Sequence, residues 1–423
     1  MDKLIYKEKT TRENRIWVRI SAACNNICMF CLDDEAQNGK FIPKDVVEEQ
    51  ISSWFKPGLY NRIIISWGEA SINPKFSHYI EYAKGLWYQR IQTVTNGNMF
   101  SSSTFCDKVF SAWLQEVTFS FHGHNPKLHD YLVWVPGAFK KSLNGLIYIK
   151  KYYPDIIVNI DIVVNKVNIV FLPEIVRFFM RFWVYEYDIL QIVPFWRWFS
   201  KYKNTLFYNI SEYKNVLHET WKLSKIPWMC MWTNRFHVEA FEWYEDLIQD
   251  PRKVKSEVMS EASHMFSPFI ESQGKLKPEC FWERCQYCFI QQYCHNFLDQ
   301  LHKPVFIPKD YKIIRWCEFP SQVYEIYGDT LKNFKETLAS FSSPLINIPH
   351  CLWGSGVFET YANMDPTYTL WDYTQKYINN LYRKKSLRCK TCIHNASCQG
   401  IHINFIRSYG FDILQPIPVN IWE

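Results

Sequence analysis

Three cysteines stand close together near the start of the chain, in the stretch CNNICMFC. They are Cys24, Cys28 and Cys31, at the spacing C-x3-C-x2-C. A disulfide would leave one thiol over, and the charged N-terminal stretch MDKLIYKEKTTREN lacks the apolar segment of a secretory signal. A closed structural zinc site needs a fourth ligand. Thiolates also bind iron–sulfur clusters, and three thiolates on a four-iron cluster leave one iron open for chemistry.

The C-terminal third of the chain holds a near repeat of cysteines. The stretches RCQYCFIQQYC and RCKTCIHNASC share the spacing R-C-x2-C-x5-C. An upstream thiol gives the first copy four candidate ligands, and both zinc and an iron–sulfur cluster fit such a set. The second copy has three cysteines, and its fourth ligand is Cys230, Cys317, Cys351, His402 or absent. The predicted ligands of the two copies are Cys280, Cys285, Cys288, Cys294, Cys389, Cys392 and Cys398.

Composition limits the class of protein. The chain has 423 residues, 48% of them hydrophobic, which is ample for two or three domains with real cores. Most of its 14 cysteines are clustered, and without a signal sequence this pattern predicts metal binding in a reducing, cytoplasmic compartment. The most apolar region, 169–190, is interrupted by charged residues, so no membrane span is expected. A net charge of +6 is too mild to imply nucleic-acid binding.

The elements that must position the first three thiols alternate between strands and helices. β-branched runs predict six strands, and segments with helical periodicity lie between them, two beginning near Pro43 and Pro74. This alternation predicts an α/β fold with a parallel sheet, whose active site gathers at the carboxyl ends of the strands. The Cys24–Cys31 loop directly follows the first strand. The predicted strands are 16–21, 62–66, 91–95, 117–121, 156–164 and 188–193.

This combination resembles the radical S-adenosylmethionine (radical SAM) superfamily. The resemblance implies a partial (β/α)6 barrel in which Cys24, Cys28 and Cys31 hold a 4Fe–4S cluster. The open iron of that cluster would bind the amino and carboxylate groups of S-adenosylmethionine. Phe30 stands at the family's aromatic position before the third cysteine, where it is expected to pack near the adenine.

Further matches to the family follow the later strands. ISWGEASINP resembles the family's GGEP element through Gly68 and Glu69, with Trp67 and Ala70 in place of the first glycine and the proline. The resemblance implies that Glu69 receives the ammonium group of S-adenosylmethionine. The other cofactor contacts that it implies are Asn96 in TNG, Ser120 in TFSFHG and Asn165 in VVNKVN.

The C-terminal cysteines resemble the SPASM or twitch extensions of radical SAM enzymes, which hold auxiliary 4Fe–4S clusters. One or two such clusters are therefore expected in a Cys-rich, mostly irregular and helical extension. The predicted organisation is a radical SAM core at 1–200, a linker or helical region at 201–275 and an auxiliary cluster domain at 276–423.

The expected function is reductive cleavage of S-adenosylmethionine to a 5′-deoxyadenosyl radical that abstracts hydrogen from a peptide or protein side chain. Alternatives are action on a small metabolite or cofactor precursor, and a non-catalytic zinc-binding scaffold. An electron donor such as flavodoxin or ferredoxin is implied. No side chain is assigned as catalytic, although His122, His124, His129 and Asp130 after the fourth strand suit either proton transfer or a polar loop.

Overall fold

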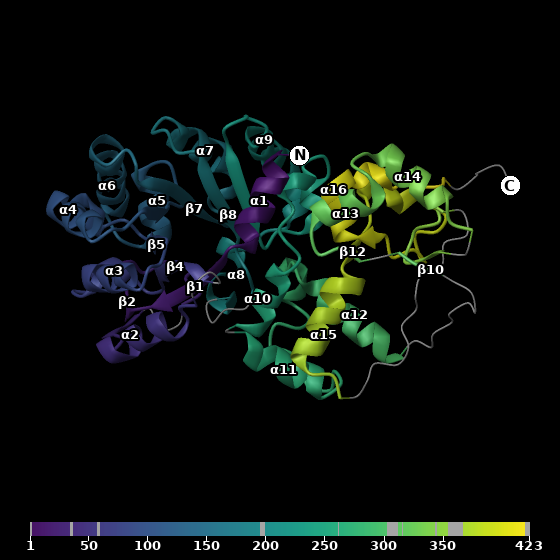
Figure 1. Cartoon of the computed structure of the whole chain (residues 1–423), viewed down its shortest axis with the longest axis horizontal. Helices are drawn as coiled ribbons and strands as arrows, with labels where there is room; N and C mark the ends of the chain where they lie inside the picture. Colours follow the sequence, from purple (N-terminus) through teal and green to yellow (C-terminus); the bar gives the residue numbers. More distant parts are fainter. Residues whose placement is uncertain are drawn as a thin grey trace. The chain divides into compact units, whose positions relative to one another are not determined.

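The structure, a computed structural model, describes residues 2–33, 37–56, 60–194, 199–260, 262–302, 312–314, 316–342, 345–353 and 367–418. The chain divides into two compact units. The half-barrel unit comprises Lys9–Ile192 and Trp196–Asn234. The C-terminal unit comprises Arg235–Glu423 together with Met1–Glu8 and Val193–Phe195. Figure 1 shows both units coloured along the chain.

The half-barrel unit is built on a seven-stranded sheet in the order β1-β4-β5-β6-β7-β8-β9, in which every neighbouring pair is parallel. The α/β half-barrel predicted from the sequence is confirmed, and β9 adds a seventh strand within the segment predicted as a linker. The strands are β1 (Asn14–Arg19), β4 (Tyr60–Ser66), β5 (Arg90–Thr95), β6 (Glu116–Ser120), β7 (Ile157–Val164), β8 (Glu186–Gln191) and β9 (Cys230–Asn234).

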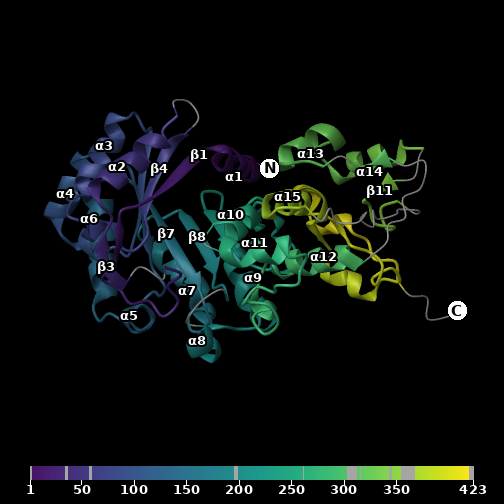
Figure 2. The same ribbon diagram turned by 90° about the horizontal axis from the view of Figure 1, so that it is seen from below.

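The two faces of this sheet differ in burial. Ile160, Ile162 and Ile189 on one face are fully buried, as expected for a parallel strand covered by helices. The alternate positions Asp161 and Asp188 are only half-buried. Figure 2 shows α3, α4 and α6 packed along the outer side of the strands. The half-buried positions therefore belong to the open, concave face of the half-barrel.

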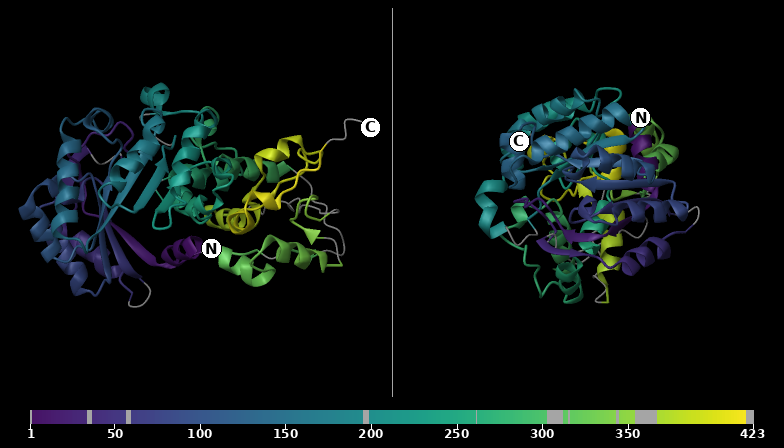
Figure 3. Two further views of the ribbon diagram at one scale, coloured as in Figure 1. Left: turned by 90° about the horizontal axis from the view of Figure 1, so that it is seen from above. Right: turned by 90° about the vertical axis from the view of Figure 1, so that its left-hand side faces the viewer.

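Two helices of this unit, α4 and α5, begin at side-chain caps that the sequence provides. The Asn125 side chain accepts a hydrogen bond from the Leu128 amide (3.0 Å) at the start of α5, with Pro126 in the first turn. Ser102 caps α4 in the same way. Figure 3 shows these helices from two further sides. The helices are α2 (Lys44–Ser53), α3 (Phe76–Gly85), α4 (Ser103–Ser111), α5 (Pro126–Val133), α6 (Ala138–Tyr152), α7 (Leu172–Met180), α8 (Phe199–Leu206) and α9 (Lys214–Leu223).

Two short strands follow β1 and set the start of the thiol loop. β2 (Ser21–Ala23) and β3 (Gln37–Phe41) pair antiparallel on either side of the cysteines. The helix α1 (Asp2–Arg12) precedes β1 and crosses the boundary between the units.

The C-terminal unit is mostly helical, and its core is rich in tyrosine. Tyr293 and Tyr373 are fully buried with ring centroids 4.7 Å apart. No helix in the described part of the chain is both long and apolar enough to cross a membrane. The elements of this unit are α10 (Lys253–Met259), α11 (Ser263–Glu271), α12 (Gln291–His302), α13 (Pro320–Tyr327), α14 (Leu331–Ala339), α15 (Leu370–Lys376), α16 (Ile403–Tyr409), β10 (Lys312–Ile313), β11 (Leu345–Ile346), β12 (Arg383–Lys384) and β13 (Ile401–His402).

Candidate active site and thiol centres

The loop that carries Cys24, Cys28 and Cys31 leaves β2 at the carboxyl end of the sheet. All three residues are partly exposed free thiols. Burial and the nearby charge of Glu69 raise the pKa of Cys24 to about 12. Burial and the charges of Cys31 and Cys24 raise the pKa of Cys28 well above its ordinary value. Three thiols that oppose each other's ionisation suit a bound cationic metal centre, which would stabilise the thiolates.

The main chain of this loop is fixed by α5. The Ile27 amide donates to the Val133 carbonyl and the Met29 amide to the Leu132 carbonyl, both at 3.0 Å. These two bonds flank Cys28. The C-terminal end of α5, whose last carbonyls lack partners inside the helix, therefore accepts the loop.

A set of asparagines links the loop to the end of β5. The Asn96 side chain donates to Cys24 Sγ (3.8 Å) and to Asn25 Oδ1 (2.6 Å). The Asn98 side chain donates to Asn26 Oδ1 (2.9 Å), and the Asn26 amide donates to Cys24 Sγ (3.4 Å). Hydrogen bonds to the ligating sulfur are a means by which proteins tune iron–sulfur clusters, so the surroundings of Cys24 fit that group. Asn96 was predicted from TNG, whereas the parts of Asn25, Asn26 and Asn98 were not.

Gly68 brings the end of β4 against β2. Its φ is +56°, and a Cβ there would lie 2.6 Å from the Ser21 carbonyl oxygen and 2.7 Å from that of Ala23. Its amide donates to Asp33 Oδ2 (2.7 Å), and Asp33 also forms an ion pair with Arg19 (3.0 Å). Asp33, just past the third cysteine, is a further residue that sequence reasoning missed. Only glycine fits at position 68, where the backbone lies against the Ser21 and Ala23 carbonyl oxygens.

Glu69 lies beside the thiol loop at the ends of β4 and β5, and its side chain is buried. Oε1 accepts hydrogen bonds from the Ser71 amide and hydroxyl and from the Thr95 hydroxyl. Oε2 accepts one, from the Asn96 amide (2.7 Å). Burial raises the pKa of Glu69, while these donors oppose that shift. A carboxylate oxygen can accept more than one hydrogen bond, so Oε2 retains capacity for an ammonium donor.

Phe30 is buried and packs edge-on against His122, with ring centroids 4.5 Å apart. His122 Nδ1 accepts from the Val163 amide (3.2 Å), and the His122 amide donates to His129 Nδ1 (3.1 Å). Burial lowers the pKa of His122 well below its ordinary value and that of His129 to about 4. Both rings are therefore neutral near pH 7, which disfavours a proton-transfer role for them.

The two remaining predicted cofactor contacts lie in different surroundings. Ser120 ends β6 on the concave face and donates to Asp161 Oδ2 (3.4 Å). Asp161 is the register partner of Asp188, which accepts from the Asn234 side chain. Asn165 is fully buried, and its side chain bonds to the Val163 carbonyl and the Val167 amide of its own turn. The structure thus gives Asn165 a part in shaping the turn and offers no support for its predicted cofactor contact.

The first C-terminal thiol centre consists of four buried cysteines: Cys280, Cys285, Cys288 and Cys294. Cys294 lies on α12, and the Cys285 thiol donates to the Cys280 carbonyl (3.6 Å). Burial and the charges of Cys280 and Cys294 raise the pKa of Cys288 well above its ordinary value. The four predicted ligands therefore lie close enough together to affect each other's ionisation.

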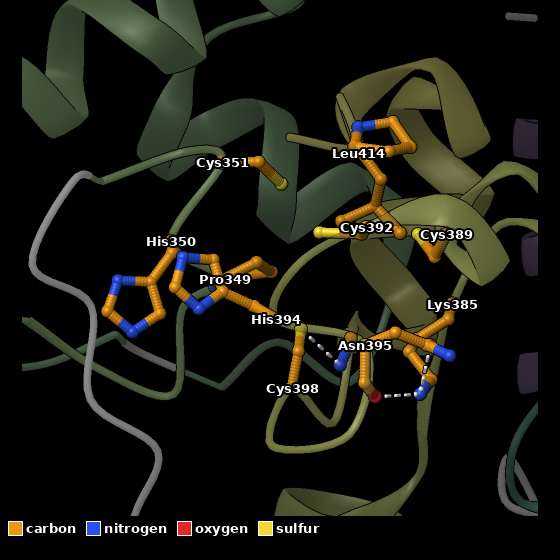
Figure 4. Close-up of a pocket in the computed structure, with 12 residues that line it drawn as sticks. Pro349, His350, Cys351, Lys385, Cys389, Cys392, His394, Asn395, Cys398 and Leu414 are labelled. Carbon is orange, nitrogen blue, oxygen red and sulfur yellow. Dashed lines mark hydrogen bonds between the residues drawn. The ribbon is translucent and has the colours of Figure 1, made fainter. Parts of the chain in front are cut away.

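The second C-terminal thiol centre gains a member from a distant part of the chain. Figure 4 shows Cys351 and His350 on one segment facing Cys389, Cys392 and Cys398 on another, around a common hollow. Burial is the main cause that raises the pKa of Cys351, followed among charges by Cys398 and Cys392. The Gly400 amide donates to Cys398 Sγ (3.3 Å). Of the candidates for a fourth ligand, the structure thus places Cys351 at this centre.

His402 has a different part in the C-terminal unit. Its Nε2 bonds to the Ile378 carbonyl (2.8 Å) and its Nδ1 accepts from the Asn404 amide at the start of α16.

Across the described ranges, no three His, Cys, Asp or Glu side chains are gathered tightly enough to bind a single metal ion. In an iron–sulfur cluster each thiolate binds a different iron, which calls for wider spacing of the sulfurs.

The half-barrel fold and the Cys24–Cys31 loop together define a class of protein. Its members have a parallel α/β half-barrel with a three-thiol loop and a buried glutamate at the carboxyl ends of the strands. Residues 18–179 match the sequence model of the radical SAM superfamily. Residues 18–179 therefore form a radical SAM domain, as the motifs predicted.

Two curated relatives share part of the chain. It is 23% identical over 211 residues to an AdoMet-dependent heme synthase of Methanosarcina barkeri, covering 49% of this chain and 57% of the relative. It is 24% identical over 178 residues to an AdoMet-dependent heme synthase of Oleidesulfovibrio alaskensis, covering 41% of this chain and 44% of the relative. The chain thus spans about half the length of the curated relatives it matches.

Solved structures resemble parts of the chain more distantly. Streptococcus suis SuiB bound to the precursor peptide SuiA has 14% identity and a TM-score of 0.44, covering 59% of this chain and 55% of SuiB. The protein anSMEcpe, with AdoMet and the Kp18Cys peptide, has 15% identity and a TM-score of 0.41, covering 49% of this chain and 60% of that protein. These scores are too low to carry an argument about substrate.

Proposed function

We propose that this protein reductively cleaves S-adenosylmethionine and uses the resulting 5′-deoxyadenosyl radical to abstract hydrogen from a peptide or protein side chain. The observation that carries this proposal is the meeting of three thiols with Glu69 at the carboxyl ends of a parallel half-barrel. A 4Fe–4S cluster held by Cys24, Cys28 and Cys31 would supply the electron and the site that binds S-adenosylmethionine. The protein's residues would bind and orient S-adenosylmethionine and the substrate, and would exclude water from the site.

The residues around the thiol loop and on the concave face have distinct roles in this proposal. Glu69 Oε2 would receive the ammonium group of S-adenosylmethionine, because it lies beside the thiols and keeps capacity to accept a hydrogen bond. Asn96 orients Cys24, and the edge-on contact with His122 fixes Phe30 where an adenine is expected. The concave face with Ser120, Asp161 and Asp188 would receive the substrate. Enclosing the reaction there protects a reactive radical from solvent.

The two C-terminal thiol centres would each hold an auxiliary 4Fe–4S cluster. We assign Cys280, Cys285, Cys288 and Cys294 to one cluster and Cys351, Cys389, Cys392 and Cys398 to the other. Such clusters would accept an electron from the product radical or bind substrate. A flavodoxin or ferredoxin would supply the first electron. All 14 cysteines are free thiols, which supports a reducing, cytoplasmic location.

The substrate class rests on the C-terminal unit. Its repeated C-x2-C-x5-C pattern resembles SPASM and twitch extensions, which commonly accompany peptide modification, and this favours a peptide or protein substrate. The curated relatives named AdoMet-dependent heme synthase instead favour a small metabolite or cofactor precursor. Mass spectrometry of candidate peptides incubated anaerobically with reduced enzyme separates the two. Turnover that depends on a metabolite and not on any peptide would contradict the peptide proposal.

The core of the proposal is tested by anaerobic reconstitution with iron and sulfide, followed by an assay for 5′-deoxyadenosine. The wild-type protein is expected to be brown and to release 5′-deoxyadenosine when reduced. The variant Cys24→Ala, Cys28→Ala, Cys31→Ala should lose about four irons and all cleavage. Cys106→Ala is the matched control, because Cys106 is buried in α4, where its thiol donates to the Phe100 carbonyl, and it belongs to none of the three cysteine groups. Wild-type protein that binds iron but never cleaves S-adenosylmethionine would refute the proposal.

A further inference from the structure

Tryptophan occupies an unusual set of backbone conformations in this chain. Of the ten non-glycine residues that have positive φ within the described ranges, seven are tryptophan. The left-handed region is disfavoured for every residue with a Cβ, and for bulky residues it is a genuine outlier. Glycine is the residue that adopts it without steric cost. The seven are Trp67, Trp87, Trp113, Trp134, Trp183, Trp243 and Trp282.

Two of these tryptophans end helices in a motif that calls for glycine. After α3 the Trp87 amide donates to the Lys84 carbonyl and the following Tyr88 amide to that of Ala83. After α4 the Trp113 amide donates to the Phe110 carbonyl and the Leu114 amide to that of Val109. This pair of bonds is the Schellman motif, whose left-handed residue is usually glycine. Trp87 and Trp113 stand at that residue, with φ of +70° and +90°.

Six of the seven side chains are exposed, so burial does not compensate for their strained backbone; Trp67 is half-buried, with the Arg19 guanidinium carbon 5.3 Å from its ring centroid. Trp87, Trp183 and Trp282 are 83%, 69% and 76% exposed. Tryptophans with ordinary backbone angles behave differently: Trp221 is fully buried in α9, and Trp232 on β9 donates its indole N–H to Glu186. An exposed indole contributes little core packing to offset the strain of its backbone.

Two of the seven stand in the cofactor loops. Trp67 and Gly68 are both left-handed directly before Glu69, with φ of +76° and +56°. Trp282 lies between Cys280 and Cys285, and its carbonyl accepts from the Cys285 amide (3.2 Å). The left-handed turn at each position directs the chain toward Glu69 in one loop and Cys285 in the other. Glycine at 67 would give the sequence Gly-Gly-Glu at the end of β4.

Composition points in the same direction. The chain has 18 tryptophans and only 14 glycines in 423 residues. Glycine is thus present at about half of its usual share of ≈ 7%. A deficit of glycine together with a surplus of tryptophan, concentrated at left-handed positions, indicates one systematic cause.

We infer that these seven positions carry glycine in the protein as its native cell makes it. The codon UGA is read as tryptophan in some genetic codes and as glycine in others, so one reassigned codon accounts for all seven at once. The inference depends on backbone geometry and does not rest on the proposed function. It also means that the exposed indoles are not a docking surface for a partner.

The direct test is to read the gene and the native protein. The gene is expected to carry UGA at the seven positions and UGG at Trp221. Peptide mass spectrometry of protein purified from the cells that encode it should find glycine at all seven positions. Tryptophan in those peptides, or UGG at the seven codons, would overturn the inference.

Substitution in the recombinant protein tests the physical argument with a matched pair. Trp134 and Trp54 are both 55% exposed and both end helices, but φ is +58° at Trp134 and −86° at Trp54. Trp134→Gly is expected to raise the unfolding midpoint, whereas Trp54→Gly should lower it or leave it unchanged. Equal shifts in the two variants would contradict the argument.

Binding of S-adenosylmethionine separates this inference from the proposed function. Trp67→Gly in the reconstituted protein is expected to bind S-adenosylmethionine more tightly than the chain with tryptophan at that position. If neither form binds it while the native peptides contain glycine, the inference stands and the proposed function fails. If Trp67→Gly weakens binding and the native peptides contain tryptophan, the inference fails and the proposed function stands.

Discussion

The thiol loop of the half-barrel and the two C-terminal thiol centres differ in their number of thiols and in their surrounding charges. Cys24, Cys28 and Cys31 are partly exposed, and a carboxylate, Glu69, raises the pKa of Cys24. The C-terminal centres have four thiols each and nearby cations: the Lys277 charge opposes the raised pKa of Cys294, and Lys385 does the same for Cys398. At Cys280, the Arg284 charge lowers the pKa and the Glu279 charge raises it.

This difference indicates how the number of thiols and the nearby charges can give similar thiol centres different roles. If these centres hold the proposed auxiliary clusters, a fourth thiol would complete the coordination and a lysine would partly neutralise the anionic cluster, which suits a centre that keeps its ligands. Three thiols beside a carboxylate leave a position open and favour a cationic ligand there, as S-adenosylmethionine is. In the proposed function, the half-barrel loop would therefore exchange a ligand, whereas the C-terminal centres would keep theirs.

The largest effect is expected from removing one thiol in each region. Cys28→Ala should abolish cleavage of S-adenosylmethionine, because the open position disappears with its cluster. Cys351→Ala should lose about four irons yet retain cleavage, because the half-barrel cluster remains. Iron counting and the 5′-deoxyadenosine assay on both variants check this. Cleavage that survives Cys28→Ala would break the comparison.

Gly68→Ala is expected to be nearly as severe. The new methyl group would overlap the Ser21 and Ala23 carbonyl oxygens at 2.6 and 2.7 Å, so β4 would have to move away from the thiol loop. Cleavage should fall by about a hundredfold or more, equivalent to roughly 3 kcal/mol. Gly85→Ala is the control, because its Cβ would meet nothing within 4 Å. Equal activity of the two variants would show that this contact is dispensable.

Acid should affect the half-barrel loop through α5. His129 has a pKa of about 4 in the fold against an ordinary 6.5, so the unfolded chain binds a proton that the folded chain does not. Stability is therefore complete above about pH 6.5 and falls as pH drops toward 4, by up to about 3 kcal/mol. Denaturant midpoints at pH 5 and 7 measure the loss, and His129→Gln should reduce it. A wild-type midpoint that is independent of pH would contradict this.

The smallest effect is expected from Glu69→Gln. The amide keeps the shape of the side chain but removes the charge that would pair with an ammonium group. Affinity for S-adenosylmethionine should fall by about tenfold to a hundredfold, the usual worth of a hydrogen bond to a charged group. Calorimetry on the reconstituted protein measures it, with Thr95→Val, which keeps the carboxylate, as control. Unchanged affinity in Glu69→Gln would place the ammonium elsewhere.

Sequence reasoning predicted the features that local pattern encodes. Apolar runs such as 62–66 located six strands, and the thiol spacing located the loop after the first. The seventh strand, β9, was missed because Cys230–Asn234 is short and its alternate positions are polar or half-exposed. Cys351 was one of several candidates because its approach to Cys389 depends on the path of a long segment, which no local periodicity records. The asparagines at 25, 26 and 98 act through tertiary contacts of the same kind.

The two backbone hydrogen bonds from the thiol loop to the end of α5 have a consequence for the rebuilding of a lost cluster. Because the Ile27 and Met29 amides donate to the Val133 and Leu132 carbonyls, main-chain hydrogen bonds hold the loop at two points independently of any metal. A protein that had lost the proposed cluster to oxygen would thus keep these two attachments of the loop that binds it. Reassembly would then require iron, sulfide and reductant, and no refolding.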